Sequence, residues 1–206
     1  MYFNKILNTK ALVTHVIMAI TMVLAMNVTA GDHSSSLTRF TSTDVNISVV
    51  GTSTLHDWEM QSDAAVSEAQ FTVDNQGQPE RLESVMFRLQ KNTLKSDKSG
   101  LDRRAYDAMN ADRHPEIIFR TNGSGDLQES GDKYEVNTKG ELTVAGVTRN
   151  IDVNATCTNG NGNELVCTGS QTLNMSDFDI DPPVMMLGTL RTGDEITINY
   201  RIVYSN

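Results

Sequence analysis

The residues of this chain that could do chemistry gather in one short stretch, STLHDWEM, at residues 53–60. It places His56 beside Asp57 and close to Glu59. A histidine flanked by carboxylates could act as a general acid and base, or could contribute to a metal site. Such a site also needs a nucleophile or further ligands that converge on the same point. The sequence contains no G-x-S-x-G motif, and no second histidine lies close to His56, so catalysis is the weaker interpretation.

Two other interpretations of this stretch stay open. In the first, Trp58, the only tryptophan in the chain, plugs one end of the fold. His56 and Asp57 would then hydrogen-bond to nearby backbone, and the Trp58 N–H would find its own partner, as buried tryptophans usually do. In the second, the stretch forms a polar rim that meets the headgroup of a ligand.

The preceding strand decides which of these side chains face inward. Residues 45–49 alternate like a strand with one buried face. Continued alternation would direct Leu55 and Asp57 inward and Trp58 outward. However, Gly51 and the Thr-Ser-Thr run after it predict a bulge or bend, which would reset the alternation.

The two cysteines, Cys157 and Cys167, flank the turn cluster NGNGN. A hairpin centred on Gly162 places the cysteines opposite each other, and the same register pairs Ile151 with Leu173. A metal site or a reactive thiol couple would need a second cysteine pair or a nearby histidine, and the sequence has neither. The symmetry therefore predicts a cross-strand disulfide, which an oxidising compartment permits.

The N-terminal segment reads as a targeting signal. Lys5 and Lys10 precede an apolar run that ends in small residues at 28–30, which predicts export and cleavage after Ala30. An uncleaved anchor helix over residues 11–28 is the alternative, because that run nearly reaches the length that spans a bilayer. Cleavage leaves 206 − 30 = 176 residues, a size that suits one domain, residues 31–206.

The charge of the chain limits its partners. The whole chain has 17 basic and 26 acidic residues, and residues 1–30 contain two of the basic ones and no acid, so the remainder has a net charge of 15 − 26 = −11. Phosphate backbones and anionic lipid surfaces would repel such a protein. We therefore expect no nucleic acid partner. We also expect ligand binding that depends little on salt and shows no preference for anionic headgroups.

Most of the remaining sequence is typical of antiparallel strands. Residues 134–144 alternate with period two, and so do the even-numbered positions from Ile196 to Tyr204. Shorter runs of the same kind occur at 45–49, 71–73, 85–89 and 117–120, and the cysteine hairpin adds two strands. The segment 99–114 alone favours a helix of about three turns, with Ser99 and Asp102 as a capping pair and Pro115 as its limit. The pattern predicts an all-β barrel or sandwich with one short helical insertion.

The segment DFDIDPPVMML, residues 177–187, should interrupt the strands, because two prolines cannot lie inside a central strand. Its apolar residues 184–187 are expected to lie outside regular pairing. They could form a moving lid over a cavity, since methionine adapts to irregular surfaces. Alternatively, the segment folds back and seals the barrel as permanent core.

Several motifs resemble the YceI-like family. GELTVAGVTRNIDV (140–153) is similar to that family's strand, turn and strand, and MNADRHPEIIFR (109–120) is similar to its helix end and following strand. GTSTLHDWEM and the tail MSDFDIDPPVMMLGTLRTGDEITINY resemble a subgroup with His-Asp-Trp. The resemblance runs from about residue 38 to 204.

The resemblance implies a lipocalin-like antiparallel barrel of about eight strands, exported to the periplasm, with a long apolar cavity. In some members that cavity holds a polyisoprenoid or another long amphiphile. The residues expected to line it here are Val49, Leu55, Trp58, Phe87, Val136, Leu142, Val144, Met185, Ile198 and Tyr200.

Three function classes follow. The first is a non-enzymatic carrier of a polyisoprenoid, quinone-like or fatty chain, for which a membrane redox or lipid enzyme is a candidate recipient. The second is a small exported metal-dependent or hydrolytic enzyme that uses His56, Asp57 and Glu59. The third is a partner or stress-response module with an incidental cavity. No cofactor or metal pattern is present, and the oligomeric state is left open, with a homodimer as one option.

Overall fold

The computed structural model describes residues 35–185 and 188–206, apart from the side chain of Met185. The expected signal segment, residues 1–30, lies outside the described residues. Ser34–Asn206 form one compact unit of the chain.

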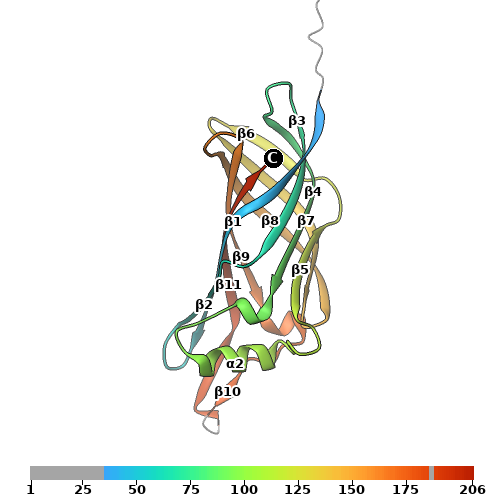
Figure 1. Cartoon of the computed structure of the whole chain (residues 1–206). Coiled ribbons are helices and arrows are strands. Elements are labelled where there is room, and N and C mark those ends of the chain that lie inside the picture. The colour runs from blue at the N-terminus through green and yellow to red at the C-terminus, as the bar shows by residue number, and fades with distance from the viewer. Residues whose placement is uncertain (1–34, 186–187) are drawn as a thin grey trace, which may run out of the picture. The chain divides into compact units, whose positions relative to one another are not determined.

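Eight long strands close into an antiparallel barrel (Figure 1). They are β1 (Ser36–Ser53), β3 (Val66–Val73), β4 (Pro79–Gln90), β5 (Glu116–Thr121), β7 (Lys133–Val144), β8 (Val147–Asn159), β9 (Glu164–Asn174) and β11 (Leu190–Ser205). Neighbouring strands pair in the order β1, β3, β4, β5, β7, β8, β9, β11, and β11 pairs with β1 to complete the ring. The predicted barrel is confirmed, and the sandwich is excluded.

Short secondary-structure elements lie at the ends of the barrel. They are β2 (Trp58–Ser62), β6 (Asp126–Ser130), β10 (Val184–Met185), the 3₁₀ turns η1 (Lys91–Thr93) and η2 (Met175–Phe178), and the helix α2 (Ser99–Ala108). Figure 1 shows β2, α2 and β10 together at one end, which we call the α2 end. Among the described residues, no helix has the length and hydrophobicity needed to cross a membrane.

The interior of the barrel follows the predicted alternation. Along β7, Tyr134, Val136, Thr138, Gly140 and Leu142 are buried, whereas the residues between them are exposed. This is the period-two pattern of a strand with one face in the core. However, the inward side chains do not fill the interior of this barrel, and a cavity remains.

Three glycines let large rings lie flat against the barrel wall. Gly51 pairs with Trp58, and Gly169 pairs with Tyr200. In both pairs a β-carbon on the glycine would collide with the ring of its partner. Gly140 makes similar room for the Phe119 ring. Glycine here does not supply an unusual backbone angle. It supplies space, a recognised way of curving a sheet while covering the bare backbone with an aromatic ring.

The cysteine hairpin forms as predicted. Cys157 and Cys167 are direct cross-strand partners joined by a disulfide, and Gly162 at the turn has a φ of +62°, which glycine adopts without strain. The expected Ile151–Leu173 pair is wrong. The β8–β9 ladder ends at Ala155–Gly169. Beyond it, β8 stays paired with β7 only, and β9 with β11 only.

The Tyr200 hydroxyl occupies the gap at the end of that ladder. It reaches across Gly169 and donates a hydrogen bond of 2.8 Å to the backbone carbonyl of Asn154. That carbonyl lies just beyond the last β8–β9 pair. The side chain therefore ties β11 to β8 where the backbone ladder between β8 and β9 has stopped, and it keeps the wall continuous.

The helix forms where expected, but its predicted cap is wrong. α2 begins after Lys98, and neither Lys98 nor Ser99 caps it with its side chain. The Asp102 carboxylate instead accepts hydrogen bonds from the backbone N–H and hydroxyl of Ser96, at 2.8 and 2.7 Å. The pair with Ser96 lowers the Asp102 pKa. Residues Ser96–Lys98 form a turn that carries the chain back to Asp102, so the helix is fastened one turn earlier than predicted.

The proline segment is partly core and partly an edge strand, and the moving lid stays a prediction. Phe178 and Ile180 are buried against Phe119 and Leu142, so this part seals the barrel as permanent core. Val184 and Met185 were expected to be unpaired, but they pair with Arg191 and Leu190 in the short edge strand β10. Both prolines precede this strand, at positions where no ladder hydrogen bond from their nitrogen is required.

Candidate functional site

The barrel encloses an apolar cavity of about 180 Å³, which we call the deep chamber. Inward-facing residues from all eight barrel strands line it: Ile47, Val49, Ser67, Ala69, Phe71, Leu82, Val85, Phe87, Leu89, Leu94, Ile117, Phe119, Val136, Thr138, Leu142, Ile151, Val153, Ala155, Cys157, Cys167, Gln171, Leu173, Ile198, Tyr200, Ile202 and Tyr204. No charged side chain of the described residues is among them. A cavity of this composition favours hydrocarbon over any charged group.

A second cavity of about 330 Å³, the mouth chamber, lies at the α2 end. Its lining comes from the β1–β2 loop, α2, η2 and the start of β11: Val49, Ser53, Leu55, His56, Trp58, Met60, Leu94, Lys98, Leu101, Arg104, Ala105, Ala108, Met109, Ile117, Leu142, Val144, Leu173, Asn174, Met175, Phe178, Ile180, Pro183, Leu190, Arg191, Thr192, Ile196 and Ile198. Unlike the deep chamber, it has charged side chains in its wall.

The two chambers adjoin. Six residues line both of them, namely Val49, Leu94, Ile117, Leu142, Leu173 and Ile198. Val49 on β1 and Ile198 on β11 are cross-strand partners at this boundary, which we call the throat. The site therefore consists of two adjacent chambers with a shared wall, one at the α2 end and one inside the barrel.

The residues predicted to line the cavity do so wherever their side chains are described. Val49, Leu142 and Ile198 line both chambers. Phe87, Val136 and Tyr200 line the deep chamber, and Leu55, Trp58 and Val144 line the mouth chamber. The side chain of Met185 lies outside the described residues. That these residues bind a ligand stays a prediction.

The stretch 53–60 turns out to be a loop at the mouth. β1 ends at Ser53 after a register shift between Gly51 and Ser53, so the expected bulge resets the alternation. Leu55, His56 and Trp58 consequently all line the mouth chamber, whereas Asp57 does not. The Trp58 N–H donates to the carbonyl of Thr52 at 3.1 Å, which agrees with the structural interpretation of this residue.

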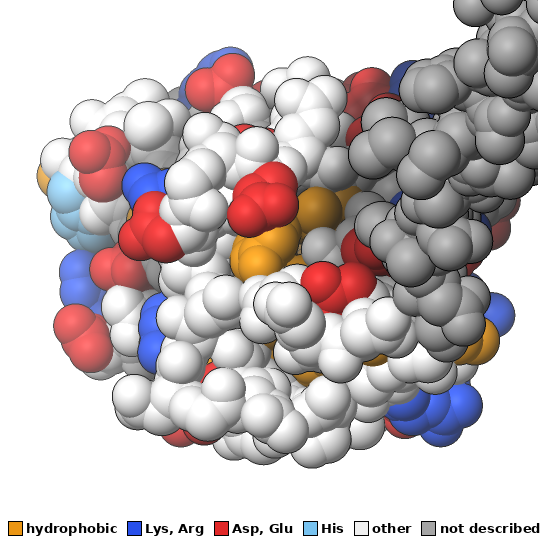
Figure 2. Space-filling view, turned by 90° about the horizontal axis from the view of Figure 1, so that it is seen from above, with side chains coloured by type: hydrophobic (Ala, Val, Ile, Leu, Met, Phe, Trp, Pro, Cys, Tyr) orange, Lys and Arg blue, Asp and Glu red, His pale blue; other side chains and the backbone are white. Residues whose placement is uncertain are grey.

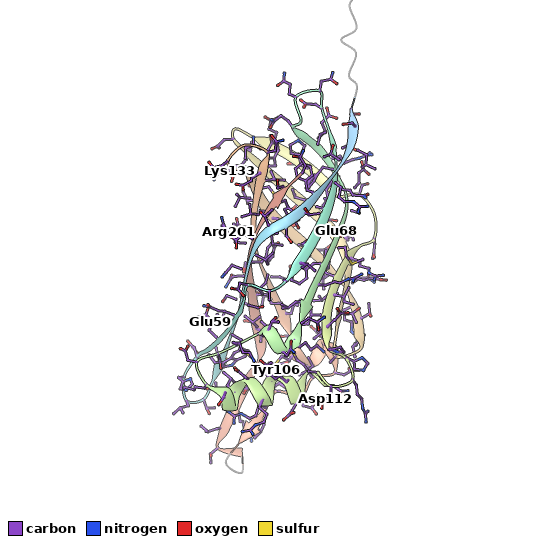
Figure 3. All side chains as sticks on the ribbon, in the orientation of Figure 1. Glu59, Glu68, Tyr106, Asp112, Lys133 and Arg201 are labelled. Carbon is purple, nitrogen blue, oxygen red and sulfur yellow. A yellow bond between two sulfur atoms is a disulfide. The ribbon has the colours of Figure 1, made fainter. Side chains whose placement is uncertain are left out.

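The side chains of His56, Asp57 and Glu59 do not converge. The His56 Nδ1–H donates to the Asp57 backbone carbonyl at 2.8 Å, and its Nε2 accepts from Lys98 Nζ at 3.2 Å. Glu59 projects from β2 away from the interior (Figure 3). Hydrogen bonds from Ser48 and Gln61 hold its carboxylate and lower its pKa. Among the described residues, no cluster of three or more His, Cys, Asp or Glu could hold a metal ion.

Helix α2 is fastened to the segment before it at three levels. Asp102 binds Ser96 near its start, the Tyr106 hydroxyl donates to the Leu94 carbonyl at 2.5 Å, and Lys91 Nζ donates to the Met109 carbonyl at 2.9 Å. Figure 3 shows Tyr106 on the helix at this end of the barrel. The helix is therefore a fixed wall of the mouth chamber, which a hydrophobic pattern alone does not reveal.

Lys91 gives this attachment a pH dependence. It is fully buried, and burial lowers its pKa from 10.5 to about 8. The unfolded chain regains the ordinary value, so between these two pH values it binds more protons than the folded chain, and the contribution of Lys91 to the free energy of unfolding rises with pH. Urea unfolding should show wild type gaining stability over Lys91→Met between about pH 8 and about pH 10. A constant difference would contradict this.

Thr138 is a polar residue in the deep chamber that sequence analysis missed. Its side-chain oxygen is buried and has no hydrogen-bond partner among the described residues. Because burying a hydroxyl without a partner is unfavourable, Thr138→Val should raise the free energy of unfolding by about 1 kcal/mol. Thr41→Val, at an exposed position of β1, is the matched control and should change little. A loss of stability in Thr138→Val alone would show that the hydroxyl is satisfied in solution.

The YceI-like domain family matches residues 28–204, most of the chain. The chain belongs to this family. The motifs at 109–120 and 140–153 thus identified it correctly, whereas the His-Asp-Trp subgroup stays a prediction. No curated protein matches this YceI-like sequence significantly.

Solved structures agree on the fold of this YceI-like protein. BcnA of Burkholderia cenocepacia superposes with a TM-score of 0.60 and 17% identity, over 77% of this chain and 95% of BcnA. A polyisoprenoid binding domain from Saccharophagus degradans gives 0.58 and 10%, over 82% and 99%. The YCEI protein of Campylobacter jejuni gives 0.52 and 15%, over 68% and 81%. At these identities the likeness extends to the barrel alone.

Proposed function

We propose that this YceI-like protein is an exported, periplasmic binding or carrier protein. It holds one long-chain amphiphile, such as a polyisoprenoid or a quinone-like lipid, with the chain in the deep chamber. It would act by binding and delivery and not by turnover, and a membrane redox or lipid enzyme is the kind of recipient that such a ligand suggests.

The pair of adjoining, largely apolar chambers is the observation that supports this proposal. A core packed at the usual density would leave few voids larger than a water molecule. Here two adjoining chambers of about 180 and 330 Å³ remain, and hydrocarbon side chains form most of their walls. Each methylene placed there would contribute about 0.8 kcal/mol before the cost of ordering the chain. The similar S. degradans protein is itself described as polyisoprenoid-binding.

The enzyme alternative has no comparable support. It required His56, Asp57 and Glu59 to act together, but Glu59 is held by Ser48 and Gln61, and the ring of His56 contacts Lys98. A positioned acid or base must reach the same reacting group as its partner. The third class, a module with an incidental cavity, predicts that the chambers bind no chain at all.

The direct test is to extract purified protein with organic solvent and to identify bound lipids by mass spectrometry. We expect a stoichiometric long-chain amphiphile. In parallel, the delipidated protein should be titrated with isoprenoid alcohols of increasing length. Affinity should rise with chain length until the chambers are filled. If the extract contains no bound lipid and affinity does not depend on chain length, the carrier function is rejected.

A further inference from the structure

We propose that the mouth chamber is a binding site for an anionic headgroup, a phosphate or a carboxylate, carried by the amphiphile whose chain occupies the deep chamber. This inference rests on the proposed carrier function and specifies the class of its ligand. It also reverses the expectation, drawn from net charge, that anionic headgroups would not be preferred.

The titratable side chains in the wall of the mouth chamber are all basic. They are His56 in the β1–β2 loop, Lys98 just before α2, Arg104 in the middle of α2, and Arg191 at the start of β11. In a chain with 26 acidic and 17 basic residues, such a lining contrasts with the overall composition. No acidic residue of the described chain lines either chamber.

Three of these basic side chains have no carboxylate partner in the described part of the chain. Within residues 35–185 and 188–206, none of Lys98, Arg104 and Arg191 forms an ion pair with a carboxylate. Lys98 Nζ contacts His56 Nε2 at 3.2 Å, and Arg191 Nε donates to the Gly188 carbonyl. Each of these two side chains has further N–H donors, and a guanidinium can present two of them to one carboxylate or phosphate.

Contacts with the β1–β2 loop place Arg191 and Lys98 on the same side of the mouth chamber. Thr54 and Arg191 exchange hydrogen bonds, in which the Thr54 N–H donates to the Arg191 carbonyl at 3.0 Å and the Arg191 N–H donates to Thr54 Oγ1 at 3.2 Å. Lys98 contacts the same loop through His56. Lys98 also immediately precedes α2, so the positive end of the helix dipole adds to the field of the side chains.

The deep chamber decides where a headgroup must lie. It has no charged residue in the described part of its wall, so an ionised headgroup there would be desolvated without a partner. The opposite end of the barrel is unsuitable as well. Figure 2 looks onto that end, where acidic side chains surround a small hollow containing hydrophobic ones. The charges of the two chambers therefore favour one orientation of an anionic amphiphile, with its chain in the deep chamber and its headgroup at the α2 end.

The test compares ligands that share a tail and differ in headgroup, namely farnesyl phosphate with farnesol and hexadecanoate with hexadecanol. In delipidated wild type, the anionic member of at least one pair should bind roughly tenfold more tightly, and the preference should shrink in high salt. The phosphate and carboxylate pairs together show which headgroup is preferred. The double variant Lys98→Gln/Arg104→Gln should lose the preference and keep its affinity for the neutral alcohols.

Arg103→Gln is the matched control, because Arg103 is exposed on the same helix and lines neither chamber. It should leave the preference unchanged. Equal binding of anionic and neutral members by wild type would overturn the headgroup site and leave the carrier function intact. A preference that survives the double variant, or that Arg103→Gln removes equally, would also overturn it. Failure of all four ligands to bind would reject the carrier function itself, and the headgroup site with it.

Discussion

Replacing Ile198 with tryptophan is expected to abolish the binding of long chains while short amphiphiles still bind. Ile198 lies at the throat, opposite Val49, and lines both chambers. A tryptophan there would fill the passage to the deep chamber. If about five methylenes are excluded, at about 0.8 kcal/mol each, the loss is about 4 kcal/mol, or roughly a thousandfold in Kd.

Titration with isoprenoid alcohols of graded length measures this effect. The fold should survive, because a cavity wall accepts added volume that a packed core would not. Asn199→Trp places the same side chain on the exposed face of β11 and should bind every length as wild type does. Val144→Trp, in the mouth chamber, should weaken short and long chains alike. If folded Ile198→Trp binds long chains normally, the chain does not pass the throat.

The second large effect is expected from the disulfide. Cys157→Ala/Cys167→Ala should lower the free energy of unfolding by about 2 to 3 kcal/mol, because the cross-link closes a short loop that the unfolded chain otherwise explores. Both cysteines are buried and line the deep chamber, so the variant also loses packing there. Urea unfolding of the oxidised, reduced and double-alanine proteins gives the difference.

Thiol counting provides the control for that measurement. Protein denatured without reductant should contain no free thiol, because Cys157 and Cys167 are the only cysteines and are joined to each other. The reduced wild type should lose most of the stability that the double variant loses. Two free thiols in protein from an oxidising compartment, or equal stability of oxidised and reduced wild type, would contradict the prediction.

The fold was predictable because strand alternation and hairpin symmetry are local properties of the sequence. The alternation over 134–144 and 196–204 identified inward residues such as Val136 and Ile198, and the spacing around Gly162 identified the disulfide. The turn at Ser96 and the end of the β8–β9 ladder were mispredicted. The Asp102 carboxylate binds Ser96, which lies outside the Ser99–Asp102 spacing used for the prediction. At the end of the ladder, the Tyr200 hydroxyl binds the Asn154 carbonyl, which is distant in sequence.

The candidate site was only half predictable for the same reason. Its hydrocarbon wall follows from strand periodicity, but its basic residues come from a loop, from α2 and the residue before it, and from the start of a strand. Lys98, Arg104 and Arg191 carry no common spacing that would mark them. Net charge predicted no preference for anionic headgroups, whereas the proposed headgroup site predicts one, because the total charge of a chain does not describe the potential at one opening.

The pairing of β1 with β11 has a consequence for how the protein is made. The Thr43 hydroxyl donates to the Val203 carbonyl, 160 residues later, so the ring cannot close until β11 has been synthesised and is free to pair. Every shorter nascent chain would keep two open sheet edges, which invite pairing with other chains. Such long-range closure is also slow. The barrel is thus closed by its last strand to be made, and loss of β11 would open the whole cavity at once.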